Sequence, residues 1–391
     1  MFLRFASCCL ILSISGCSVF SDKDNAAQPT KLEAIDATVS LKRLWRHDTG
    51  KGTDQQLLKL VPAISDSYIY VADRSGSVEA LQLEDGKRLW KTETKTALSA
   101  GPGQGEGLVL VGTSDGELIA LDEEDGSLLW RISVSSEVLA IPRVHSGIAL
   151  VQTADGNVTG YDSQSGEQRW VFDRTEPVLT LRGTSSPVII DGIALVGFAS
   201  GKLAALDVES GRPLWESSIS LPRGRSEIER LVDVDSDPVV AQGILYAGSF
   251  QGSLAAIDLS GGSILWKRDL SAHSGMSVDS GQLYTTDDSS QVWALDISNG
   301  RSMWKQDKLK HRHLTGPVTF DDFIAVGDLE GYVHLLSKED GHFLGRIKVG
   351  KAGIQSVPVR INDTLLVLGA GGNLGLFSHS TAEKKQTANK D

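Results

Sequence analysis

A repeat of roughly 40 residues limits what this chain can fold into more than any other feature of its sequence. In five successive repeats a turn glycine is followed by a tryptophan at a constant spacing and preceded by a proline at the same spacing. The glycine and tryptophan pairs are Gly76 with Trp90, Gly116 with Trp130, Gly156 with Trp170, Gly201 with Trp215 and Gly252 with Trp266. This period is typical of propeller blades, which cannot bury both faces until their neighbours pack on them.

One repeat shows the internal organisation of such a blade. Residues 187–215 contain four short β-favouring runs separated by Asp191-Gly192, Ser200-Gly201 and Ser210-Gly211. Glycine supplies the positive φ that tight hairpin turns require, so these pairs indicate hairpins. Each repeat therefore predicts a four-stranded antiparallel meander.

Counting the middle-turn positions gives eight repeats, at residues 76, 116, 156, 201, 252, 290, 331 and 372. The eighth repeat ends before its outermost strand, whereas Leu41-Lys-Arg-Leu-Trp45 matches the strand that ends at tryptophan elsewhere. We expect an all-β, eight-bladed propeller of four-stranded blades, closed by an N-terminal strand around Trp45, because closure removes free sheet edges. Gly345 replaces the expected tryptophan, so its blade should pack differently.

The N-terminus has the features of a lipoprotein signal. Arg4 precedes an apolar run from Phe5 to Ile14 that is too short to span a bilayer. Ile14-Ser15-Gly16-Cys17 resembles the bacterial lipobox, which implies removal of residues 1–16 and acylation of Cys17. Several acyl chains on one residue would anchor the protein stably to a membrane. Ser18 is compatible with export to the outer membrane.

The composition suggests four segments. Residues 1–16 form the signal peptide, 17–37 the lipidated cysteine with a polar tether, 38–379 the propeller and 380–391 a disordered tail. The net charge of -12, without a lysine or arginine cluster, argues against nucleic-acid binding. Cys17 is the last of the three cysteines in the chain, so the propeller has no thiolate metal site.

No other motif predicts a metal or cofactor. Asp233-Val-Asp235-Ser-Asp237 begins like a calcium loop but has Pro238 and Ile244 where that loop requires glycine and glutamate. His311 and His313 lack a third ligand nearby and are better explained as exposed loop histidines. We therefore expect no cofactor.

Insertions point to a binding surface. In most repeats the link from a tryptophan to the next proline is short, as between Trp90 and Pro102. It is longer between Trp170 and Pro187, and longest between Trp215 and Pro238. These links leave from the face of the middle turns, and long loops on a rigid scaffold favour recognition. The alternative is that Leu179 and Leu181 extend a buried strand and that the acidic residues of the links cap turns.

Runs such as Gly116-Glu-Leu-Ile-Ala-Leu-Asp122 resemble the tryptophan-docking motifs of pyrroloquinoline-quinone enzymes. With the lipobox in front, nearly all of the mature chain resembles the BamB family of outer-membrane assembly factors. The resemblance implies a non-enzymatic periplasmic scaffold, lipid-anchored to the outer membrane, that binds the POTRA domains of BamA and assists folding and insertion of outer-membrane proteins. Carried over to this sequence, the partner-binding candidates are Leu179, Leu181, Arg182, Asp233 and Asp235.

Two other functions stay open at this point. A quinone-dependent dehydrogenase often uses an adjacent cysteine pair, but Cys8-Cys9 is removed with the signal. A periplasmic peptide binder could take extended segments, including unfolded outer-membrane proteins, on its sheet edges or in the central channel. No residue pattern demands that activity.

Overall fold

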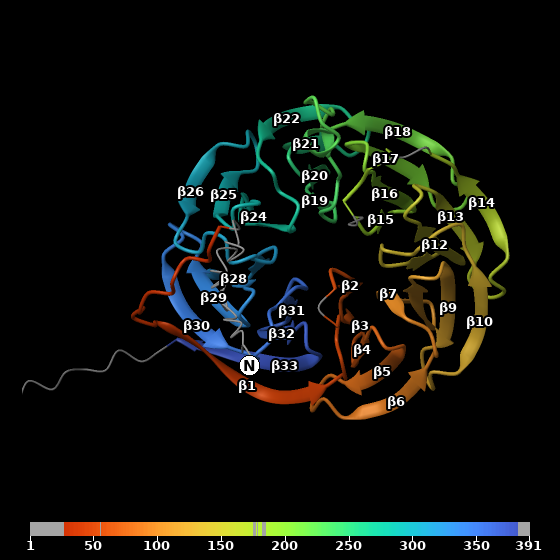
Figure 1. Cartoon of the computed structure of the whole chain (residues 1–391), viewed down its shortest axis with the longest axis horizontal. Helices are drawn as coiled ribbons and strands as arrows, with labels where there is room; N and C mark the ends of the chain where they lie inside the picture. Colours follow the sequence, from red (N-terminus) through yellow and green to blue (C-terminus); the bar gives the residue numbers. More distant parts are fainter. Residues whose placement is uncertain (1–26, 55, 175–176, 178, 182–184, 382–391) are drawn as a thin grey trace, which may run out of the picture.

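The computed structural model describes residues 27–54, 56–174, 177, 179–181 and 185–381. Within these residues the strands form eight sheets, which Figure 1 shows as blades of a closed ring. The predicted eight-bladed β-propeller is therefore confirmed. We number the blades 1 to 8 in the chain order of their innermost strands.

The strands of blades 1 and 2 are β3 (Ala63–Ile64), β4 (Tyr68–Ala72), β5 (Ser77–Gln82), β6 (Arg88–Glu93), β7 (Leu98–Gly105), β8 (Leu108–Thr113), β9 (Glu117–Asp122) and β10 (Leu128–Ser133), with β2 (Lys59–Leu60) added to blade 2. Those of blades 3 and 4 are β11 (Arg143–His145), β12 (Ile148–Gln152), β13 (Val158–Asp162), β14 (Gln168–Phe172), β15 (Val188–Ile190), β16 (Ile193–Gly197), β17 (Lys202–Asp207) and β18 (Pro213–Ser218).

Blades 5 and 6 contain β19 (Val239–Ala241), β20 (Ile244–Gly248), β21 (Ser253–Asp258), β22 (Ile264–Asp269), β23 (Met276–Asp279), β24 (Gln282–Thr286), β25 (Val292–Asp296) and β26 (Ser302–Gln306). Blades 7 and 8 contain β27 (Val318–Thr319), β28 (Phe323–Gly327), β29 (Tyr332–Ser337), β30 (Phe343–Lys348), β31 (Val359–Ile361), β32 (Thr364–Leu368), β33 (Asn373–Thr381) and β1 (Val39–Asp48). A 3₁₀ turn, η1 (Ile228–Arg230), precedes blade 5.

The N-terminal strand closes the ring as predicted. β1 pairs antiparallel with β33, and Trp45 lies opposite Leu376. Figure 1 shows β1 and β33 side by side in blade 8. One departure from four-stranded blades is β2, whose two residues pair in parallel with β7 at the inner side of blade 2. β2 lies within the link from β1 to β3, which is long enough to reach β7. The repeat pattern does not predict this extra strand.

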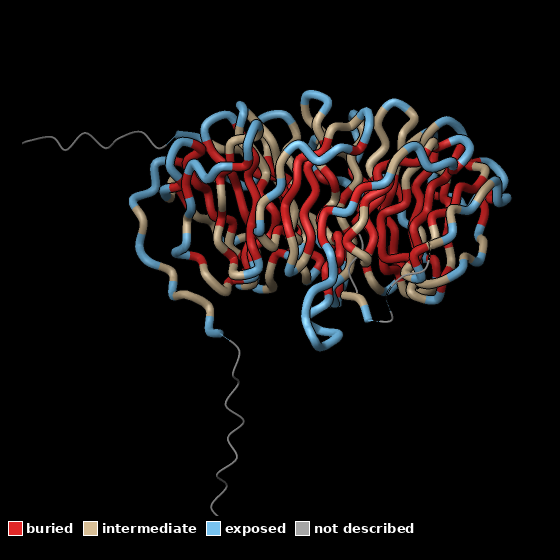
Figure 2. The backbone as a smooth tube through the Cα atoms, turned by 90° about the horizontal axis from the view of Figure 1, so that it is seen from above, coloured by how far each residue is buried: buried red, intermediate tan, exposed pale blue. Residues whose placement is uncertain are grey.

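The middle strands are buried on both sides. Every residue of β8 is buried, because blades 1 and 3 cover its two faces. In β10, at the outside, Trp130 is the one buried residue and most of the others are exposed. Residues of neighbouring blades form shared clusters, for example Leu195 and Leu203 of blade 4 with Leu245 of blade 5. Figure 2 shows the buried segments through the middle of the ring. The core is thus a series of contacts between blades.

A turn of the form Asp-x-x-x-Gly joins the third and fourth strands in several blades. In blade 2, Asp122 Oδ1 accepts the backbone N–H of Glu124, and the N–H of Gly126 donates to the Asp122 carbonyl. Gly126 has φ +72°, a conformation that costs glycine little. The turn chemistry is local, and for that reason it recurs from blade to blade.

Each tryptophan of the repeat fastens its blade to the next one. The indole N–H of Trp90 donates to the carbonyl of Glu123, and its ring lies against Gly126. The same bond recurs between the other tryptophans and turn carbonyls, namely Trp45 to Leu83, Trp130 to Ser163, Trp170 to Val208, Trp215 to Leu259, Trp266 to Ile297 and Trp304 to Lys338. The glycines and tryptophans are therefore two halves of one contact between blades.

The exception is Gly345, as the repeat pattern predicts. Blade 8 takes its third and fourth strands from the two ends of the chain, so it has no turn on which a tryptophan could pack. A Cβ atom at Gly345 would instead meet the backbone carbonyl of Val39 in β1. A small residue is needed there because β1 crosses from blade 7 to blade 8.

The residues before β1 form an extended segment along blades 6 and 7, which we call the N-terminal strap (residues 27–38). The N–H of Thr30 donates to the carbonyl of Lys310 over 3.0 Å, and the N–H of Thr38 donates to that of Leu344 over 2.8 Å. The strap is therefore fixed by backbone hydrogen bonds near both ends.

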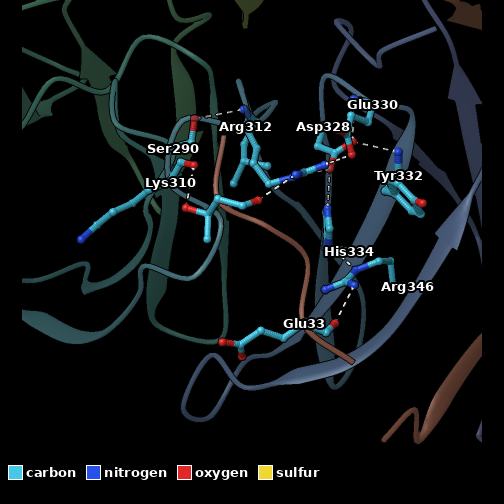
Figure 3. A network of polar contacts seen from close by, with 11 residues as sticks. Glu33, Ser290, Lys310, Arg312, Asp328, Glu330, Tyr332, His334 and Arg346 are labelled. Carbon is cyan, nitrogen blue, oxygen red and sulfur yellow. Dashed lines mark hydrogen bonds and ion pairs between the residues drawn. The ribbon is translucent and has the colours of Figure 1, made fainter. Parts of the chain in front are cut away.

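A buried arginine holds the strap from inside the ring, as Figure 3 shows. Arg312 is 2 % exposed and donates to the carbonyl of Thr30, to Asp328 and to Glu330. His334, also buried, lies 2.9 Å from the same Asp328 carboxylate. Burial lowers the pKa of His334, so its ring stays neutral between its partners.

Candidate functional site

The two longest links between blades lie on one face of the ring. The first long link is residues 173–187, from β14 to β15, and the second long link is residues 219–238, from β18 to β19. Ser185 Oγ accepts the N–H of Gly197, while the N–H of Val234 donates to Phe198. Both links thus meet the middle turn of blade 4. We call this side the long-loop face, the lower side in Figure 2.

Two aspartates of the second long link bind backbone groups of the first. The N–H of Leu181 donates to Asp233 Oδ2 over 2.6 Å. The N–H of Ser186 donates to Asp237 Oδ1 over 2.5 Å. Carboxylate acceptors make strong hydrogen bonds to backbone N–H groups, so each aspartate holds the first long link in place. The links form one surface.

The structure assigns different environments to the predicted site residues. The Leu179 side chain is 41 % exposed and Leu181 is half-buried, so the two do not simply extend a buried strand. Asp233 is 1 % exposed, and its carboxylate points inward to the Leu181 N–H. Arg182 lies outside the described residues, as does Cys17.

An arginine fixes the start of the first long link. Arg174 forms a 2.5 Å ion pair with Glu216 of β18. Its guanidinium also lies 5.0 Å from the ring centre of Phe198 and 5.7 Å from that of Phe172. Stacking of a guanidinium on aromatic rings adds a cation–π attraction to the ion pair. Spacing along the chain did not single out this residue.

The second long link also carries an exposed projection. Residues 221–230 are all exposed, and Figure 2 shows an exposed loop extending below the ring. Leu221 is 59 % and Ile228 is 65 % exposed. Together with Leu179 they place apolar side chains on the long-loop face. Apolar anchors inside a polar rim are typical of protein interfaces.

The carboxyl group of Asp235 has an altered protonation equilibrium. Burial raises its pKa to about 6, although the Lys59 ammonium acts in the opposite direction. Lys59 itself donates to the backbone carbonyl of Asp235 over 3.3 Å and to Asp237 Oδ1 over 2.6 Å. Lys59 belongs to β2, and the repeat pattern had not singled it out.

Carboxylates of the acidic run 233–237 accept hydrogen bonds from backbone N–H groups and from a lysine ammonium. Asp233 accepts a backbone N–H, and Asp237 accepts another together with the Lys59 ammonium. Across the described part of the chain, histidine, cysteine and carboxylate side chains do not gather in threes that could hold a metal ion. In that same part, helices long and apolar enough to cross a membrane are also absent.

The tryptophan contacts between blades and the paired long links define a class: an eight-bladed propeller of pyrroloquinoline-quinone-type repeats with a loop surface on one face. The family model described as outer membrane protein assembly factor BamB matches residues 74–306. The chain therefore belongs to the BamB family.

Individual relatives agree with this assignment. The assembly factor BamB of Pseudomonas aeruginosa is 43% identical over 369 residues, covering 94% of this chain and 97% of that protein. BamB of Alkalilimnicola ehrlichii is 46% identical over 336 residues, covering 86% of this chain and 88% of the relative. The crystal structure of BamB from Moraxella catarrhalis has a TM-score of 0.80 at 28% identity, covering 87% of this chain and 100% of that one.

Membership of this family determines the general activity. The protein is an outer membrane protein assembly factor and not an enzyme. The resemblance to the assembly-factor family noted in the sequence is confirmed, and the dehydrogenase alternative is set aside.

Proposed function

We propose that this protein is a lipid-anchored scaffold of the outer-membrane assembly machinery and that its long-loop face binds the periplasmic POTRA domains of BamA. Its action is positional: it orients these domains or holds folding clients near them, and no covalent bond is made or broken. The observation that carries the proposal is the joining of the two long links by Asp233 and Asp237, which builds a defined surface from two loops.

The contacts suggest separate tasks for the candidate residues. Leu179 is exposed and would fill an apolar patch of the partner. Arg182 would make charge-assisted hydrogen bonds to it. Asp233 is buried, so it would shape the surface by holding Leu181 and would not touch the partner itself. Asp235 would help to shape the second long link, because its backbone carbonyl accepts a hydrogen bond from Lys59.

Photo-crosslinking in intact cells tests the docking surface. A photoreactive residue at Leu179 or at Ile228 should give an adduct with BamA. Glu84 is the control, because it is exposed in a turn on the opposite face. An adduct from Glu84 alone, or none from the two long-link positions in a folded protein, would contradict the proposal.

A second experiment tests the anchor. We propose that Cys17 carries the lipid and that the protein faces the periplasm from the outer membrane. Wild-type protein should incorporate labelled palmitate and fractionate with the outer membrane, and Cys17→Ala should do neither. Equal palmitate labelling of both proteins would place the acyl chains elsewhere.

A further inference from the structure

Lys59 connects a third link to the long-loop face. Residues 49–62 run from β1 to β3 and bind the middle turns of the two blades beside them. The N–H of Thr49 donates to the carbonyl of Gly372, and the N–H of Arg74 donates to that of Gly52. These contacts place the third link on the same face as the two long links.

The end of this third link is held rigidly before it reaches them. Lys59 and Leu60 pair in parallel with β7, opposite Ala100 and Gly101. Leu60 is 1 % exposed and packs in the cluster between blades 1 and 2. The backbone of Lys59 is thus part of a sheet, and its side chain projects from a fixed point.

From that point the ammonium reaches a different part of the ring. Lys59 Nζ lies 2.6 Å from Asp237 Oδ1, and Asp237 stands two residues before β19 of blade 5. The same carboxylate oxygen accepts the N–H of Ser186 over 2.5 Å. One oxygen atom therefore joins all three links, and Lys59 brings a positive charge to this junction. A second cation, Arg143, interacts with the Asp237 carboxylate and donates to the carbonyl of Pro187 over 3.0 Å.

We propose that Lys59 is a positioning residue of the docking surface. It holds Asp237 and the carbonyl of Asp235, and through them it fixes the spacing of the two long links before a partner arrives. The inference rests on the proposed function, since the surface it orders is the one proposed to bind BamA. A surface ordered in advance loses less conformational freedom on binding and so binds more tightly.

The Lys59→Met variant keeps the aliphatic stem and removes the charge. In the full-length protein the Ser186 amide should exchange hydrogen about tenfold faster, and the Kd for full-length BamA in detergent should rise about five- to tenfold, within the range measured for partly buried ion pairs. Lys59→Arg should restore much of both effects. Lys42→Met, at an exposed lysine of the outer strand β1, should change neither.

The outcomes separate this inference from the proposed function. Unchanged Ser186 exchange in Lys59→Met would overturn the junction itself, whatever the binding result. Faster exchange with unchanged BamA affinity, while Leu179→Ser weakens binding, would overturn the positioning role alone. If Leu179→Ser also binds normally, the docking surface is misplaced and both proposals fail.

Discussion

The indole ring of Trp90 occupies the space that a side chain at Gly126 would need. A Cβ atom added at Gly126 would fall 2.5 Å from Cε3 of that ring. Since the two residues belong to blades 1 and 2, the glycine is required by a contact between blades as well as by its own φ of +72°.

Gly126→Ala should therefore destabilise the protein by about 3 kcal/mol, through overpacking added to backbone strain. Gly107→Ala is the matched control, because Gly107 has φ +80° but no atom within 4 Å of the added Cβ. It should cost only about 1 kcal/mol. Denaturant unfolding measures both, and equal losses would mean that the tryptophan adjusts freely.

Removal of the charge at Arg312 should loosen the strap. Arg312→Met leaves Asp328 buried without its guanidinium partner, so we expect a loss of about 3 kcal/mol and faster proteolysis within residues 27–38. Lys308→Met breaks only the exposed pair with Glu33 and should cost less than about 1 kcal/mol. Unchanged proteolysis of Arg312→Met would show that the backbone hydrogen bonds suffice.

Asp235 should make stability depend on pH. Because its folded pKa of about 6 lies above the unfolded value, the folded state holds an extra proton between pH 4 and 6, and stability falls as pH rises through this window. Asp235→Asn carries no such charge. The free energy of unfolding of Asp235→Asn minus that of the wild type should therefore rise by up to ~3 kcal/mol between pH 4 and pH 7. A constant difference across this range would contradict the raised pKa.

Asp233→Ala should disturb the docking surface without removing an exposed group. The Leu181 N–H would lose its acceptor, at a cost of about 1–3 kcal/mol, and BamA affinity should fall. Glu84→Ala, on the opposite face, should leave both unchanged. Calorimetry of unfolding and of BamA binding gives the two quantities, and normal affinity in Asp233→Ala would exclude a shaping role.

The sequence was sufficient for the fold because the information is local and repeated. Turn glycines such as Gly126 and acceptors such as Asp122 act within a few residues, and their spacing to Trp130 recurs. The incomplete eighth repeat and the segment around Trp45 were enough to predict how the ring closes, and the pairing of β1 with β33 confirms it.

The sequence located the candidate site, but it could not show which residue of the site has which role. Long insertions pointed to residues 171–186 and 216–237, since an insertion is visible as a change in spacing, and the structure places the two links at residues 173–187 and 219–238. Whether Leu179 is exposed and Asp233 buried depends on how the two links pack together.

What only the tertiary structure decided are the contacts between distant parts of the chain. Lys59 and Asp237 are 178 positions apart, and Arg312 and Thr30 are 282 apart. Neither pair belongs to the repeat, so the periodicity of the sequence does not predict either contact. These residues meet because the closed ring brings unrelated links together, whereas the blades themselves follow from turn chemistry that each repeat carries on its own.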